Sequence, residues 1–179
     1  LKSDYNNLNV GISSVMDFYN QKIMKDFIKF SANILKPDDF GLLIIRQNPK
    51  DPKSKEYEPK NYIEAAKCLE KFILAGKFGK GKVRKNILDI YLRHLISKTL
   101  VTGKRQFLCK AGTDLGFIDC DGTVNLCEKF ENENMGNLRD YDRDFKKLWF
   151  SPKNIKYKKR VNNDIICNAC THETEGIGP

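Results

Sequence analysis

The sequence predicts an α/β fold in its first part, followed by a smaller α+β segment. Three observations support this. Residues 7–46 alternate between strand-like and helix-like apolar patterns, and two longer helical patterns follow up to residue 101. After Thr102-Gly103-Lys104, short strands, glycines and cysteines replace the long helices. We therefore expect two domains, residues 1–102 and residues 103–179.

The first predicted unit is a strand, a helix and a second strand. Leu8, Val10 and Ile12 alternate with polar or small residues, as in a strand, and apolar residues then recur at helical spacing from residue 23 to residue 35. The apolar run from Phe40 to Ile45 is typical of a strand in a parallel sheet. Together these patterns predict a βαβ unit.

Polar residues follow both predicted strands. We place Ser13 and Ser14 at the carboxyl tip of the first strand and Arg46 at that of the second. Because α/β folds bind ligands at the carboxyl ends of parallel strands, these three residues are candidates for binding a cofactor or substrate. The simpler interpretation is that they are ordinary polar residues at strand ends.

Two helices are expected next. One includes the apolar positions between Tyr62 and Ile73, and the other runs from about Val83 to Val101. Cys68 lies within the first of these patterns, next to its apolar positions, where a lone cysteine is more often a packing residue than a ligand.

The C-terminal segment begins with a predicted hairpin. Strands over residues 115–119 and 123–127 flank Asp121-Gly122, which is a strong hairpin turn signal. A short helix follows, for which Asp142 is the expected cap and Pro152 the expected end. We expect the basic stretch 153–160 to lie on the surface.

Composition limits the possible classes of protein. The net charge of +9 could indicate a nucleic-acid partner, but the lysines are scattered, which favours an ordinary solvated surface. No apolar stretch approaches the roughly 18 residues of a membrane helix. The polar start has no signal peptide and no initiator methionine, so we expect a cytoplasmic protein and a fragment of a longer chain.

Four of the six cysteines form the main candidate site. Seventeen residues separate Cys109 from Cys127, thirty-nine separate Cys127 from Cys167, and Cys167 and Cys170 form a CxxC motif. In a reducing compartment such thiols hold a metal more often than they form disulfides. Four thiolates suit either an iron–sulfur cluster or a structural zinc, although zinc ribbons usually offer two CxxC knuckles. Cys120, on the hairpin turn, is not expected to be a ligand.

The segment resembles a known family. The runs CKAGTDLGFIDCDGTVNLCEKF, MGNLRDYD, FKKLWFSP and CNAC occur in that order across residues 109–170. They resemble the C-terminal extension of radical S-adenosylmethionine (SAM) enzymes, called SPASM in its long form and Twitch in its short one. The preceding half resembles, less specifically, the end of that family's partial (β/α)6 barrel. The tail THETEGIGP carries no further cysteine, which is closer to Twitch.

The resemblance implies a function for the four cysteines. Cys109, Cys127, Cys167 and Cys170 would hold one auxiliary 4Fe–4S cluster that transfers electrons. His172 could donate a hydrogen bond to a cluster sulfur, or lie on an exposed tail. The CxxxCxxC motif that carries the SAM-cleaving cluster is absent from this sequence, so SAM and a second 4Fe–4S cluster are expected only in the complete enzyme.

The complete enzyme would be an oxidoreductase or would modify a peptide or sugar. Its expected partners are a peptide or small-molecule substrate and a reductant such as flavodoxin or ferredoxin. Neither a membrane nor nucleic acid is expected as a partner. The alternative is a non-catalytic zinc protein with four cysteine ligands and a basic surface that binds nucleic acid.

Overall fold

The computed structural model describes residues 7–46, 49–127, 134–161 and 163–171. The chain divides into two compact units, Leu1–Ser97 and Lys98–Pro179. Helices and small sheets occur together, so the general α/β class is confirmed, whereas the barrel end stays a prediction. Within the described residues, every helix is too short or too polar to cross a bilayer.

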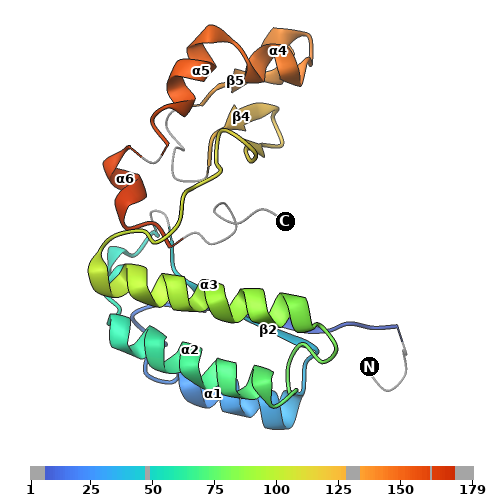
Figure 1. Cartoon of the computed structure of the whole chain (residues 1–179), viewed down its shortest axis with the longest axis vertical. Helices are drawn as coiled ribbons and strands as arrows, with labels where there is room; N and C mark the ends of the chain where they lie inside the picture. The colour runs from blue at the N-terminus through green and yellow to red at the C-terminus, as the bar shows by residue number, and fades with distance from the viewer. Residues whose placement is uncertain (1–6, 47–48, 128–133, 162, 172–179) are drawn as a thin grey trace. The chain divides into compact units, whose positions relative to one another are not determined.

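The first unit is built on a strand–helix–strand unit, as expected. Strands β1 (Gly11–Met16) and β2 (Asp39–Ile44) pair in parallel along their whole length. Helix α1 (Met24–Phe30) and the π-helical turn η1 (Ser31–Leu35) connect them (Figure 1). The prediction of a βαβ unit is therefore confirmed.

Two longer helices complete this part of the chain. After the 3-10 turn η2 (Pro52–Lys55) come α2 (Pro59–Leu74) and α3 (Val83–Thr102). Helix α2 packs against α1, and its apolar face is buried as the spacing predicts. The buried apolar side chains of the unit are those of Met16, Met24, Ile28, Ala32, Phe40, Leu42, Ile44, Tyr62, Ala65, Ala66, Leu69, Ile73, Phe78 and Ile96. The first unit thus has a conventional apolar core.

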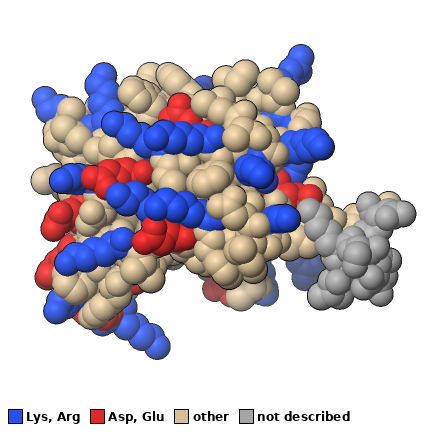
Figure 2. Space-filling view, turned by 90° about the horizontal axis from the view of Figure 1, so that it is seen from below, with Lys and Arg blue, Asp and Glu red and all other residues tan. Residues whose placement is uncertain are grey.

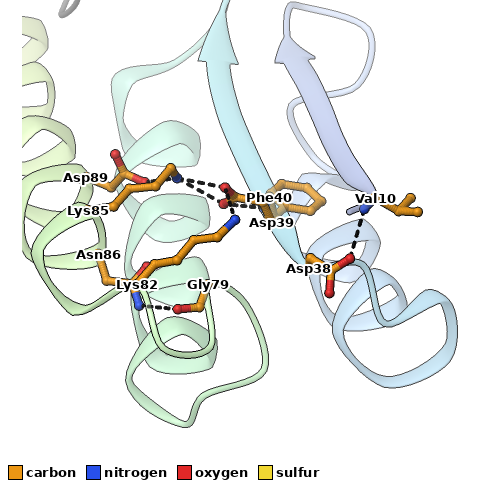
Figure 3. Close-up of polar contacts among 9 residues, drawn as sticks. All are labelled: Val10, Asp38, Asp39, Phe40, Gly79, Lys82, Lys85, Asn86 and Asp89. Atoms are coloured by element: carbon orange, nitrogen blue, oxygen red, sulfur yellow. Dashed lines mark hydrogen bonds and ion pairs between the residues drawn. The ribbon is translucent and has the colours of Figure 1, made fainter. Parts of the chain in front are cut away.

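Charged residues join the start of β2 to α3. The carboxylate of Asp39 accepts a hydrogen bond from the Lys85 ammonium group at 3.0 Å, and Lys82 Nζ lies 3.7 Å from it (Figure 3). Lys85 also pairs with Asp89 on the next turn of the helix, at 2.7 Å. The network lies at the amino end of β2, opposite the edge where α/β folds bind ligands.

The second unit contains a small antiparallel sheet. Its strands are β3 (Phe117–Ile118), β4 (Thr123–Asn125) and β5 (Gly136–Asn137), in that order. The β3–β4 turn ends at Gly122, whose φ of +89° favours glycine. This confirms the predicted hairpin, with shorter strands than the sequence suggested.

Short helices follow this sheet in the chain. They are the 3-10 turn η4 (Leu138–Tyr141) and the α-helices α4 (Phe145–Trp149), α5 (Pro152–Lys158) and α6 (Ile165–Asn168). The expected cap at Asp142 is wrong, because the Asp144 carboxylate accepts the hydrogen bond from the Lys147 amide while Asp142 ends the preceding turn.

The expected surface position of the basic stretch 153–160 is confirmed for Lys153, Lys156 and Lys159, which are exposed, but the stretch forms most of a helix that also buries a side chain. Pro152 begins α5, and Ser151 caps the helix by accepting a hydrogen bond from the Asn154 amide. The side chain of Asn154 is fully buried. A proline that follows the end of one helix is here also the first residue of the next.

Candidate metal centre

Three of the four candidate thiols belong to one core. Cys127 and Cys167 are 6% and 7% exposed and lie in a buried cluster with Val124, Leu126 and Trp149, among others. Cys109 packs against this cluster from its edge. The second unit therefore includes cysteines in its buried cluster, whereas the buried hydrophobic side chains of the first unit include no cysteine.

Cys109 is positioned by a tight turn. Ala111 donates its backbone N–H to the Cys109 sulfur at 3.3 Å, and Gly112 donates to the Leu115 carbonyl at 2.7 Å. Gly112 has φ +77°, and a Cβ there would lie 2.8 Å from Leu126 Cδ2. The turn therefore requires glycine, and it directs an amide at the sulfur. Amide hydrogen bonds of this kind stabilise a thiolate and raise the potential of a cluster bound to it.

Cys127 follows β4 by two residues, so the hairpin fixes its place in the chain. The β3–β4 pairing sets Phe117 opposite Asn125. On the β5 side, the Met135 amide donates to the Val124 carbonyl at 2.8 Å. The pairing of these short strands fixes the segment that precedes Cys127. Cys127 then lies in the buried cluster.

Cys167 lies in helix α6, and Cys170 is the second residue after its end. The Cys167 amide donates to the Asp164 carbonyl at 2.9 Å, and the Cys170 amide donates to the Cys167 carbonyl at 3.3 Å. This chain reversal is the usual way in which a CxxC motif brings two sulfurs together. Both side chains are buried, Cys170 at 6% exposure.

A cavity opens beside this motif. It is lined by the segment Gly103–Leu108 together with Cys167 and Asn168, and its volume is about 610 Å³. The backbone N–H of Arg105 donates to the Asn168 carbonyl at 2.5 Å, which ties the segment to α6. The space lies directly against one of the proposed sulfur ligands.

Helices α4 and α5 close the core from another side. Trp149 Cζ3 would lie 2.7 Å from a Cβ on Gly116, so the indole packs closely on the hairpin backbone. The buried amide of Asn154 donates to the carbonyls of Met135 and Leu148 at 2.9 and 2.8 Å. Asn154 thus connects α5 to α4 and to the start of β5. Ser151-Pro152 is a sequence signal for the start of α5, but not for these contacts of Asn154.

The four cysteines are suitable donors for a thiolate-ligated metal group, but the described residues do not form an assembled metal site. No three histidine, cysteine, aspartate or glutamate side chains within them lie close enough together to hold an ion. The fit rests on chemistry and burial, since three of the four thiols stand in or against one core and the fourth, of Cys170, is buried. The ligand set of Cys109, Cys127, Cys167 and Cys170 stays a prediction, and His172 lies outside the described residues.

The other two cysteines lie elsewhere. Cys120 is an exposed thiol on the hairpin turn. Cys68 is half-buried on α2, where its sulfur donates to the Lys25 carbonyl at 3.9 Å. Burial raises the pKa of the Cys68 thiol, while the nearby charges of Lys29, Lys71 and Lys25 oppose this rise. A thiol that resists ionisation is a poor metal ligand.

The expected placement of Ser13 and Ser14 at a strand tip is wrong. Strand β1 continues to Met16, so Ser13 and Ser14 pair with Gly41 and Leu42 in mid-strand. Ser13 is exposed, and the Ser14 hydroxyl donates to the Met24 sulfur at 3.4 Å. The strand runs on because a half-buried serine continues the inward alternation of its neighbours.

Arg46 does lie just beyond the carboxyl end of β2, as expected. Its guanidinium group is close enough to Tyr57 for the positive charge to affect the ionisation of the Tyr57 phenol. Burial raises the pKa of the Tyr57 phenol, and the positive charge of Arg46 opposes that rise. Its role in binding a cofactor or substrate stays a prediction.

The second unit is therefore a small domain with short strands and helices that gathers thiols into its core. Residues 109–171 match the model of the SPASM family, described as an iron-sulfur cluster-binding domain. The resemblance found in the sequence is confirmed by this match, which is consistent with a SPASM/Twitch domain of a radical SAM enzyme. Searches of curated proteins and of solved structures gave no match to the chain.

Proposed function

We propose that residues 103–179 form an auxiliary electron-transfer domain that holds one 4Fe–4S cluster on Cys109, Cys127, Cys167 and Cys170. The match to an iron-sulfur cluster-binding domain over residues 109–171 carries this proposal. The shared core of Cys109, Cys127 and Cys167 supports it. When bound, a cluster with four protein thiolates supplies one-electron transfer and leaves no iron open to substrate.

The residues around the thiols have separable tasks in this proposal. The turn at Gly112 directs the Ala111 amide at the Cys109 sulfur. Trp149 and Leu148 exclude water from the core, and Asn154 fixes the helices that carry them. Burial and amide hydrogen bonds are the features through which a protein sets the reduction potential of such a group.

The remaining parts of the proposal concern the complete enzyme. It would cleave SAM with a second 4Fe–4S cluster on a CxxxCxxC motif that this sequence does not contain. Its reaction would oxidise or modify a peptide or small-molecule substrate, with electrons supplied by flavodoxin or ferredoxin. Ser13, Ser14 and Arg46 are weaker candidates for its cofactor or substrate cavity, since only Arg46 lies at a strand end.

Cysteine substitutions test the ligand set. Iron and sulfide are measured after anaerobic purification of the full chain and of Cys127→Ala and Cys120→Ala. We expect Cys127→Ala to lose the iron, because it removes a buried core thiol. Cys120→Ala should retain it, because that thiol is exposed on the hairpin turn. Equal loss in both variants would contradict the ligand assignment.

A structural zinc is the competing outcome. Zinc accepts the same four thiolates in a tetrahedral site. The family match favours iron and sulfide over zinc. A zinc-loaded protein without sulfide would replace the electron-transfer proposal with a purely structural one.

A further inference from the structure

The helices α4 and α5 carry an unusual charge distribution. Between residues 145 and 163 the sequence has seven lysines and arginines and no aspartate or glutamate. In the first unit, by contrast, positive and negative side chains are interleaved, as in the pairs Lys25–Glu64 and Lys29–Asp26. Figure 2 shows such an interleaved face of the molecule. The α4–α5 segment is therefore a local concentration of positive charge.

Most of these cations lie at the surface. Lys146, Lys153, Lys156 and Lys159 are exposed, and within the described residues none of the four is in an ion pair. Helix α5 buries its opposite side, on which Asn154 lies, and Val161 is buried beyond its end. The exposed side of the helix thus carries Lys153 and Lys156, and Lys159 follows its end.

Apolar side chains lie among these cations. Phe150 is 62% exposed and Ile155 is 48% exposed. Exposed apolar residues surrounded by charge are the usual composition of a protein-binding surface, which has an apolar centre and a polar rim. We call the set Phe150, Lys153, Ile155, Lys156 and Lys159 the α4–α5 face.

The α4–α5 face is linked to the core that contains the thiols through Lys158. Lys158 Nζ lies 3.9 Å from the centre of the Trp149 ring and 5.0 Å from that of Phe150. Burial lowers the pKa of Lys158, whose stem passes over Gly112, three residues after Cys109. Trp149 itself belongs to the same buried cluster as Cys127 and Cys167. This side of the second unit therefore adjoins the core that contains the thiols.

We propose that the α4–α5 face is the docking surface for an acidic one-electron carrier protein. The inference rests on the proposed electron-transfer function of the domain. The cationic rim would attract and orient an acidic partner, and Phe150 and Ile155 would be covered by it. Docking here brings the partner's redox group close to the thiol-containing core, which a partner bound to the first unit need not achieve. The exposed apolar centre favours a protein over nucleic acid as the occupant.

Charge reversal tests this docking surface. The affinity of the full chain for an acidic flavodoxin is measured by titration calorimetry at low and physiological salt. Lys153→Glu/Lys156→Glu should weaken binding by about tenfold or more at low salt, and by less as salt is raised. The matched control is Lys67→Glu/Lys71→Glu, which replaces two exposed lysines of α2. It changes the net charge of the chain by the same amount. It should alter affinity by less than about twofold.

Further outcomes decide between the explanations. Phe150→Ala, which changes no charge, should weaken binding with little dependence on salt. Equal weakening by both double variants would show a general charge effect and overturn the proposal. The proposal would also be overturned if the chain does not bind flavodoxin but binds single-stranded RNA through the same lysines. Iron is measured in each sample. An iron-loaded chain that does not bind flavodoxin would contradict the docking surface alone. A chain without iron would contradict the proposed function.

Discussion

The two units of the chain are stabilised in different ways. The first has six-residue strands and helices of up to twenty residues, and its core consists of apolar side chains and one tyrosine. The second has strands of two or three residues and α-helices of four to seven, apart from the end of α3, and its core includes cysteines. Small cores with little regular structure usually need a metal or disulfides to be stable. We therefore expect metal binding and folding to be coupled in the second unit and not in the first.

Removing the metal group should give the largest difference between the units. We expect amide hydrogen exchange in α4 and α5 to speed up by roughly a hundredfold or more after the iron is chelated, because ligand binding there is also folding free energy. Exchange in α2 should stay unchanged, since its apolar face packs in the first unit. Equal acceleration in α2 and α5 would show that the units do not differ in this way.

Asn154→Ala should give the next largest effect. The substitution leaves the buried carbonyls of Met135 and Leu148 without this donor, and should cost about 2 kcal/mol or more of the free energy of unfolding. Asn163→Ala is the matched control, because that side chain also donates to a carbonyl, of Lys159, but is exposed. It should change stability by less than about 0.5 kcal/mol. Urea unfolding of the second unit measures both, and similar losses would remove the role assigned to Asn154.

Substitutions at two glycines, one in each unit, test how closely other atoms pack around these positions. A Cβ on Gly116 would lie 2.7 Å from the Trp149 ring and 3.2 Å from the Asn125 carbonyl oxygen. We expect Gly116→Ala to cost about 1–3 kcal/mol of unfolding free energy and to red-shift Trp149 fluorescence. Gly11→Ala in β1 meets its nearest atom only at 3.8 Å, so it should change stability by less than about 1 kcal/mol. A neutral Gly116→Ala would contradict the close packing of Trp149.

The smallest effect is expected from the charged network of the first unit. Burial alone would raise the pKa of Asp39, but the hydrogen bond from Lys85 and the charges of Lys85 and Lys82 outweigh it and lower that pKa. A lowered carboxyl pKa adds stability above the unfolded value of about 3.8, and this is lost as pH falls further. Because Lys85 is 45% exposed, Asp39→Asn should cost less than about 1 kcal/mol at neutral pH.

The same network has an upper pH limit. Burial alone would lower the pKa of Lys85, but its hydrogen bonds to Asp89 and Asp39 raise it above 10.5. Its contribution is therefore present below that pH and is lost as pH rises through the folded pKa. Unfolding curves at several pH values should show that wild type and Asp39→Asn begin to converge below about pH 3.8 and meet once pH has fallen through the folded pKa of Asp39. A difference that persists there would exclude this electrostatic cause.

The long elements were predictable from the sequence because they repeat one pattern many times. The helices α2 and α3 and the parallel strand pair follow from apolar spacing, and the hairpin follows from Asp121-Gly122. β5 has only two residues, too few to show any periodicity. Pro152 stops a helix and can also start one, so spacing alone did not reveal α5.

The candidate site was partly predictable for a different reason. The identity of the thiols and the match to SPASM follow from residues that are far apart in the sequence but occur in a fixed order. The roles of Asn154 and Gly116 depend on contacts across the core, for which the sequence has no local signal. Ser13 and Ser14 were misplaced because a polar residue ended the expected strand, although a half-buried edge strand tolerates one.

Metal analysis of the full chain, purified without oxygen, tests the central claim most directly. The account predicts a brown protein with broad absorbance near 400 nm and about four irons and four sulfides per chain. A colourless protein that contains about one zinc per chain and no sulfide would contradict it.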